Sequence, residues 1–396
     1  MCALVLALSF AAWIPGAPFE QSSDARARAG ALAAVADEHA AAGRMTDAIR
    51  AMEEAERIAP TWAELKVNLA ALRSRAGDYP GAIAAARDAL RIDGSLEGAW
   101  FNLGLAQLKS GDATAAVKTL VRFKDRVDAP PMLMAALGLA LFQSDRVTEA
   151  ATVLQRAVDA GVRDPDTVLS LGRARLRLNE PLRAAGAARM LLTSAPRNAQ
   201  ALLLLGDAED ARHDWPAAEA AYRGALAADP KVPRGHYSLG LLLYKQRRYD
   251  EAASAFDREL ATDPDYPPAL QYRAELELDR GQTDAALPLL ERLTSVAPHH
   301  AEGWRGLGRA RIDQGRPVEA AAALRRGLEL SPEDASAHFL LGRAYEQAGR
   351  TAEAAASFSR AAELNQRTRD RLLERLSGKQ PGAKRAGRGG RPGGGR

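Results

Sequence analysis

Residues 301–334 read AEGWRGLGRARIDQGRPVEAAAALRRGLELSPED, and residues 335–368 read ASAHFLLGRAYEQAGRTAEAAASFSRAAELNQRT. The two stretches have the same length and carry small residues at the same places, as Gly308 matches Gly342 and Ala320 matches Ala354. A shift of 34 residues extends this agreement, without insertion or deletion, to ten repeats. They begin at residues 29, 63, 97, 131, 165, 199, 233, 267, 301 and 335. A fixed period of this length indicates a stack of small supersecondary units.

Four positions of the repeat predict its local structure. Position 20 is alanine and position 8 is alanine or glycine in all ten repeats, which indicates two helices that approach closely where both carry small side chains. Position 15 is glycine in six repeats and Asp145, Asn179, His213 or Arg247 in the others. Glycine, Asn and Asp suit the left-handed residue that ends a helix, and proline at position 32 of six repeats stops the second helix. The repeat therefore predicts helix, tight turn, helix.

This pattern resembles the tetratricopeptide repeat, which has a large apolar residue at position 4, Leu-Gly at 7 and 8, Tyr at 11 and 17, Ala at 20, an aromatic residue at 24 and Pro at 32. The agreement is densest at residues 99–104, 236–240 and 303–308. Position 11 holds a tyrosine only at Tyr345, and position 24 is aromatic only at Tyr222, Phe256 and Phe358. The resemblance implies an all-α fold, a right-handed α-solenoid superhelix of ten helix-turn-helix repeats.

We divide the chain into four segments. Residues 1–28 are a signal-peptide-like apolar segment and linker, 29–368 the repeats, 367–377 an amphipathic capping helix, and 378–396 a basic Gly/Arg-rich tail expected to be disordered. The apolar run at 2–13 has signal-peptide length and is too short to span a bilayer. We expect an exported protein, periplasmic or envelope-associated; a cytoplasmic protein with a buried first helix is the alternative.

The positive charge of the chain lies in its tail. The whole chain carries +4, and the six lysines and arginines of residues 377–396 contribute +6, which leaves −2 for the rest. The tail resembles arginine-glycine segments that bind RNA, but it has no aromatic residues to stack on bases. A solubilising tail, or one attracted to anionic lipid or another polyanion, explains this composition equally well. The chain could contact a membrane surface through this tail or through the N-terminal segment.

Sequence motifs of catalysis are missing. No phosphate-binding loop, nucleophile elbow or zinc-protease motif occurs, and Cys2 is the only cysteine. The one adjacent histidine pair, His299 and His300, has no carboxylate or cysteine at metal-ligand spacing. We expect no catalytic residue, no metal and no cofactor, and thus a protein that is not an enzyme.

The resemblance also implies a binding surface. In the family, positions 2, 5, 9, 12 and 13 of the first helices face the ligand along a concave groove. Here this assignment predicts an apolar groove with basic edges, which suits a peptide that has hydrophobic anchors and acidic residues. The alternative is that some of the large side chains pack against the next repeat. The predicted partner-binding residues are Phe101, Leu105, Leu108, Leu139, Phe142, Arg173, Arg177, Arg234, Tyr237, Leu241, Tyr244, Lys245, Arg305 and Arg309, and the last repeat adds Phe339 and Arg343.

The function implied by the resemblance is that of a non-catalytic scaffold or adaptor, which holds a partner protein or peptide in its groove. Analogy within the family suggests a role in bacterial envelope or secretion assembly. Two alternatives stay open. One is a nucleic-acid-associated protein that uses the basic tail, and the other is a regulatory subunit of a separate enzyme.

Overall fold

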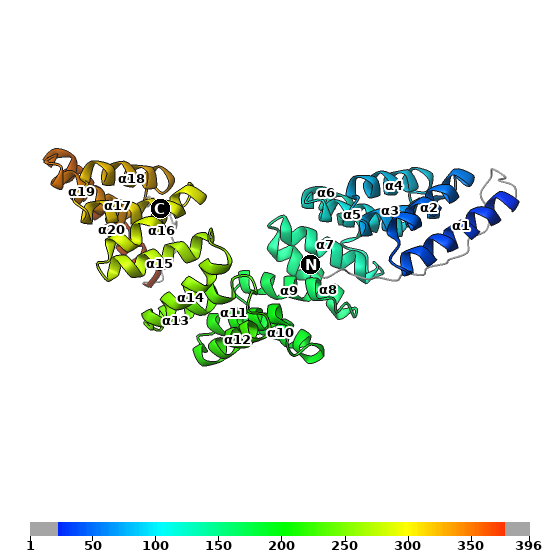
Figure 1. Ribbon diagram of the computed structural model, residues 1–396, viewed down its shortest axis with the longest axis horizontal. Helices are drawn as coiled ribbons and strands as arrows, with labels where there is room; N and C mark the ends of the chain where they lie inside the picture. Colours follow the sequence, from blue (N-terminus) through cyan, green and yellow to red (C-terminus); the bar gives the residue numbers. More distant parts are fainter. Residues whose placement is uncertain (1–22, 377–396) are drawn as a thin grey trace, which may run out of the picture. The chain divides into compact units, whose positions relative to one another are not determined.

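The computed structural model describes residues 23–376. These residues form twenty α-helices and one 3-10 turn, without a strand among them, and each 34-residue period holds one helix pair (Figure 1). The chain comprises two compact units, Met1–Pro196 (unit 1) and Arg197–Arg396 (unit 2). The predicted α-solenoid of ten helix-turn-helix repeats is therefore confirmed.

Unit 1 contains the first five repeats. Each helix packs on the next one, and the first helices α3, α5, α7 and α9 also contact one another in series. The helices are α1 (Ser23–Ala41), α2 (Met45–Ile58), α3 (Ala63–Arg75), α4 (Tyr79–Ile92), α5 (Glu97–Lys109), α6 (Ala113–Leu120), the 3-10 turn η1 (Val121–Phe123), α7 (Pro131–Gln143), α8 (Val147–Asp159), α9 (Pro165–Arg177) and α10 (Pro181–Ser194).

Unit 2 contains the other five repeats in the same arrangement. Its first helices α11, α13, α15, α17 and α19 contact one another in series, so their side chains form one continuous surface. The helices are α11 (Ala199–Ala211), α12 (Trp215–Ala228), α13 (Gly235–Lys245), α14 (Tyr249–Thr262), α15 (Pro267–Asp279), α16 (Thr283–Val296), α17 (Ala301–Asp313), α18 (Pro317–Leu330), α19 (Ala335–Gln347) and α20 (Thr351–Leu376).

The turn between the two helices of each repeat has the left-handed residue that the sequence predicts. Position 15 has a positive φ in all ten repeats, between 58° and 90°, including the four repeats without glycine there. The left-handed conformation lets the chain reverse within a few residues and start the second helix. This prediction is confirmed at every repeat.

The change His213→Gly is expected to raise the free energy of unfolding by about 0.5–1 kcal/mol. His213 has a φ of 62°, where a side chain costs roughly 1–2 kcal/mol, and glycine removes that cost while adding some entropy to the unfolded chain. Chemical denaturation measures the difference. The reverse change Gly281→Ala, at a φ of 71° with open space around it, should lower stability; shifts of equal sign in the two variants would contradict this account.

The small residue at position 8 serves a different contact from the one expected. The sequence suggested that it meets the alanine at position 20, but the nearest atoms belong to position 24. A Cβ on Gly308 would lie 2.4 Å from Cγ of Leu324, and one on Gly206 would lie 2.5 Å from the ring of Tyr222. The glycine leaves room for a large side chain from the second helix. Position 20 is nevertheless at most 4% exposed in all ten repeats.

In some repeats, a large side chain at position 4 hydrogen-bonds the first helix to the loop before it. The indole N–H of Trp304 donates to the carbonyl of Pro298 at 2.9 Å, and His338 Nε2 lies 3.1 Å from the carbonyl of Pro332. Both contacts reach back six residues to position 32. The residue that stops one repeat is thus hydrogen-bonded to the first helix of the next.

Two helix boundaries depart from the regular pattern of the repeats. The seventh repeat keeps the phase that begins at residue 233, but its first helix starts late: Arg234 has a φ of 65° and α13 begins at Gly235. The capping helix expected at 367–377 is not a separate element, because α20 continues to Leu376. Gln366 replaces the proline found at position 32 elsewhere, so nothing interrupts the helix, and Leu372 is 56% exposed instead of packed on the repeats.

Several predictions concern residues outside the described part of the chain. The apolar run 2–13 and the tail 378–396 both lie there, so export, nucleic-acid binding and membrane attraction stay predictions. Among residues 23–376, no helix combines the length and the apolar character needed to cross a membrane.

Candidate partner-binding site

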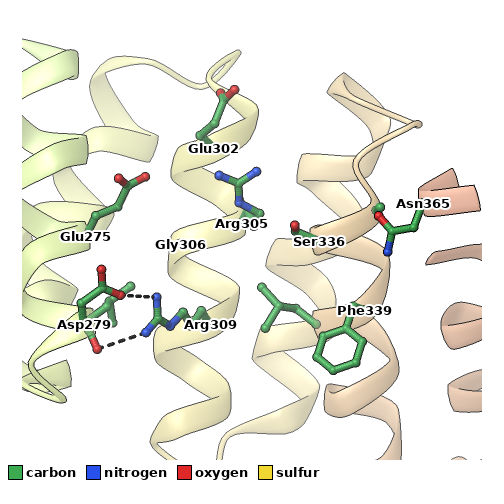
Figure 2. Close-up of a pocket in the computed structure, with 12 residues that line it drawn as sticks. Glu275, Asp279, Glu302, Arg305, Gly306, Arg309, Ser336, Phe339 and Asn365 are labelled. Atoms are coloured by element: carbon green, nitrogen blue, oxygen red, sulfur yellow. Dashed lines mark hydrogen bonds and ion pairs between the residues drawn. The ribbon is translucent and has the colours of Figure 1, made fainter. Parts of the chain in front are cut away.

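A hollow of about 520 Å³ opens on the first helices of unit 2 (Figure 2). Three successive first helices, α15, α17 and α19, supply most of its wall, and α20 adds one side chain. The lining residues are Glu275, Leu278, Asp279, Glu302, Arg305, Gly306, Arg309, Ala335, Ser336, Phe339, Leu340 and Asn365.

The hollow lies on the surface that the family resemblance assigns to ligands. Eight of its residues occupy the ligand-facing positions of their repeats. Position 2 is held by Glu302 and Ser336, position 5 by Arg305 and Phe339, position 9 by Glu275 and Arg309, position 12 by Leu278 and position 13 by Asp279. The regular 34-residue phase brings these positions from three repeats to one place. Of the predicted partner-binding residues, Arg305, Arg309 and Phe339 are brought together here.

Both arginines of the hollow are already paired with aspartates. Arg305 Nη1 donates to Asp334 at 2.7 Å. Arg309 Nη1 donates to Asp279 at 2.9 Å (Figure 2). A second nitrogen of Arg309 donates to the carbonyl of Leu278 at 3.2 Å. The Arg309 contacts join two neighbouring repeats, and the Arg305 contact joins α17 to the residue that caps α19. Both arginines therefore neutralise acids of the chain itself.

The most exposed large apolar side chain of the hollow is Phe339. Its side chain is 51% exposed, and its ring lies 5.5 Å from the ring of Phe358 with a tilt of 54°. A large aromatic side chain that stays half in water beside a hollow can serve as an anchor for an apolar group of a ligand.

The predicted residues Tyr237 and Tyr244 belong to an aromatic cluster on α13, α14 and α15. The ring of Tyr237 lies 5.3 Å from that of Tyr266, and the ring of Tyr244 lies 5.3 Å from that of Tyr272. Both tyrosines are partly buried against the core of unit 2, as is Leu241 on the same helix. Burial raises the pKa of both phenols. Packing between repeats, the alternative considered from sequence, therefore accounts for much of this cluster.

Two predicted cations of α13 are paired in the same way as the arginines of the hollow. Arg234 Nη2 donates to Asp207 at 2.9 Å, and Lys245 Nζ donates to Asp210 at 2.5 Å. The backbone N–H of Arg234 also donates to the buried carboxylate of Glu259 at 3.1 Å, which holds this residue in its left-handed conformation.

The predicted residues of unit 1 range from buried to exposed. Leu108 is only 7% exposed and belongs to the core, which corrects its assignment to the partner-binding surface. Arg177 lies over the ring of Phe142 at 5.9 Å and forms an ion pair with Asp145. Arg173 is exposed on α9. The remaining predicted residues, all half-buried, are Phe101, Leu105 and Leu139.

Sequence reasoning missed the acidic wall of the hollow. Glu275, Asp279 and Glu302 occupy positions 9, 13 and 2 of their repeats, the same positions that singled out the apolar and basic residues. Listing the acids at those positions would have found them. Asn365 comes from α20, outside the first helices, and had no such signal.

One member of the histidine pair, His300, has a structural role. The backbone N–H of Gly303 donates to His300 Nδ1 at 3.2 Å, so His300 caps the N-terminus of α17. Within residues 23–376, no three or more His, Cys, Asp or Glu side chains are grouped so as to hold a metal ion.

The stacked helix pairs and the hollow on their first helices define a helical-repeat binding protein. The model of the tetratricopeptide repeat family matches residues 67–124, 101–165, 169–233, 209–267, 273–334 and 309–367. The chain belongs to the tetratricopeptide repeat family, whose repeats serve as scaffolds for protein interaction. None of the curated proteins compared with the chain matches it.

Solved structures with a similar fold are tetratricopeptide repeat proteins and a yeast protein. A tetratricopeptide repeat protein from Parabacteroides merdae is 18% identical, with 62% of this chain and 97% of that chain covered and a TM-score of 0.48. YrrB, described as a TPR protein with an unusual peptide-binding site, is 19% identical over 50% of this chain and 100% of its own, with a TM-score of 0.42. Yeast Tom70 is 14% identical over 88% and 94%, with a TM-score of 0.39.

Proposed function

We propose that the chain is a non-catalytic scaffold whose unit 2 binds a short extended segment of a partner protein in the hollow on α15, α17 and α19. The observation that supports this most is the composition of the wall. Positions 2, 5, 9, 12 and 13 of three successive repeats converge there around the half-exposed ring of Phe339. Convergent polar groups beside one apolar anchor are typical of a recognition site.

The dimensions of the hollow fit a few residues of a peptide. The hollow has a volume of about 520 Å³, and its first helices belong to a series in contact from α11 to α19. A segment that lies across these helices would meet a new set of side chains at each repeat. The setting in a bacterial envelope or secretion assembly stays a prediction, because it depends on residues 2–13.

A photo-crosslinking experiment tests this proposal. We expect a benzoyl-phenylalanine placed at Ser336, in the hollow, to crosslink a partner protein in cells, and the same group at Val318 to give no such product. Val318 is 76% exposed on α18 and lies outside the hollow, so it is the matched control. Adding Phe339→Ala to the Ser336 variant should reduce the crosslinked product about five- to tenfold, because truncating an interface anchor costs more than about 1 kcal/mol.

The proposal fails if the two positions capture the same proteins in the same amounts. It also fails if the product from position 336 is insensitive to Phe339→Ala, because the aromatic anchor then contributes nothing to binding.

A further inference from the structure

The cations of the hollow offer little to an acidic ligand. Arg305 and Arg309 each donate to an aspartate of the chain, at 2.7 and 2.9 Å, and Arg309 also donates to a backbone carbonyl. An incoming carboxylate would have to displace those partners or share the remaining N–H groups. The acidic peptide suggested by the sequence is therefore not the ligand that this surface fits best.

Two carboxylates on the wall have only weak partners. Glu275 accepts a hydrogen bond from the amide of Gln271 at 3.0 Å, which is a neutral group. Glu302 lies 3.6 Å from His300 Nδ1, but that nitrogen accepts the N–H of Gly303 and so has no proton to donate. Among the residues that the structure describes, no lysine or arginine forms an ion pair with either glutamate.

Aromatic rings lie close to the same carboxylates. The pKa of the Tyr272 phenol is raised, mainly by burial and in smaller part by the charges of Glu275 and Glu302. The pKa of Tyr244 is raised by burial and then by Glu275 and Asp279. The acidic wall and the tyrosine cluster are thus neighbours on one surface of unit 2.

This combination of groups favours a cation. Carboxylates form charge-assisted hydrogen bonds with ammonium and guanidinium groups, and aromatic rings attract the same cations through their electron-rich faces. The wall residues Glu275, Asp279 and Glu302 outnumber the cations Arg305 and Arg309, and Asp334 adds one more acid beside Arg305. The net charge of the site is therefore negative.

We infer that the partner segment carries a lysine or arginine that binds between Glu275 and Glu302, next to an apolar side chain that packs on Phe339. This inference rests on the proposed function, since it names the chemistry of the segment held in the hollow. The cation pairs with two carboxylates that have no lysine or arginine partner in the free protein. The apolar side chain removes the half-exposed ring of Phe339 from water.

Selection from a displayed library of random 12-residue peptides on the full chain tests the inference. We expect the selected peptides to be enriched in lysine or arginine next to a large apolar residue. Their dissociation constants, measured by fluorescence anisotropy, should rise about tenfold in the double variant Glu275→Gln, Glu302→Gln, since each partly exposed charge pair contributes up to about 1 kcal/mol.

A matched double variant controls for the loss of charge. Glu329→Gln with Glu333→Gln also removes two exposed carboxylates of unit 2, but neither lines the hollow, and we expect unchanged affinity. Added salt should weaken binding to the native chain more than binding to the Glu275→Gln, Glu302→Gln variant. Salt screens the charges of the two glutamates, and the variant lacks them.

The outcomes separate the inference from the proposed function. Acidic peptides that lose affinity with Arg305→Gln and Arg309→Gln, and keep it with Glu275→Gln and Glu302→Gln, would overturn the inference and leave peptide binding in the hollow intact. Peptides insensitive to every variant of the hollow, or a selection that yields no binding peptide, would overturn both.

Discussion

Replacing Phe256 with alanine is expected to lower the free energy of unfolding of the surrounding repeats by about 3–5 kcal/mol, as large-to-small changes of buried aromatic residues do. Phe256 is fully buried, its ring stacks on that of Tyr272 at 5.8 Å, and it fills the space that Gly240 leaves open. The alanine variant would leave a cavity between α13, α14 and α15. Neighbouring repeats cannot close it without moving the Tyr272 side chain beside the acidic wall.

Hydrogen exchange shows where Phe256→Ala acts, because repeat proteins can unfold locally and exchange reports on each helix separately. We expect amide protection in α13–α15 to fall by about 10²–10⁴-fold, with little change in α3–α5.

Phe358→Ala is the control for Phe256→Ala. Phe358 occupies the same position of the last repeat but is only half-buried, so its loss should cost clearly less. Phe256→Leu should keep most of the stability, because Leu120, Leu154 and Leu324 occupy this position in other repeats. Equal losses for Phe256→Ala and Phe358→Ala would show that burial at position 24 does not decide the effect.

Gly308→Ala is expected to destabilise unit 2 by about 1–3 kcal/mol, although alanine is the better helix former by about 1 kcal/mol. The added Cβ would lie 2.4 Å from Cγ of Leu324, a side chain that is fully buried and cannot easily give way. Overpacking therefore outweighs helix propensity at this position.

Gly224→Ala is the matched control for Gly308→Ala. Gly224 also lies inside a helix, but its Cβ would meet Leu202 at 3.7 Å, an ordinary contact. We expect this variant to be about 0.5–1 kcal/mol more stable than the native chain, since only helix propensity changes. Chemical denaturation of both variants gives the comparison. A gain of stability for Gly308→Ala would refute the close approach of positions 8 and 24.

Part of the candidate site could be predicted from the sequence. The repeat phase and the family resemblance together pointed to positions 2, 5, 9, 12 and 13, and the hollow uses these positions. Arg305, Arg309 and Phe339 were named on that basis, and all three line the hollow. The acidic character of the wall was not predicted, although Glu275, Asp279 and Glu302 occupy the same positions as the predicted basic and apolar residues.

The ion pairs of the hollow could not be predicted from the sequence. Arg305 and Asp334 are 29 residues apart in the chain, and Arg309 and Asp279 are 30 apart. Whether two such side chains meet depends on the offset between adjacent first helices and on the rotamers that packing permits. The helix offset and the rotamers are set by how the repeats stack. The spacing of the residues in the sequence does not reveal them.

The amino-acid sequence by itself determined the ten helix pairs and their left-handed turns, because helix propensity, small residues and helix stops act within a few residues of one another. Only the tertiary structure decided that position 8 makes room for position 24, that Leu108 is buried, and which acids of the hollow lack a cationic partner. These features depend on side chains about one helix or one repeat apart, whose distances are set by how the helices pack.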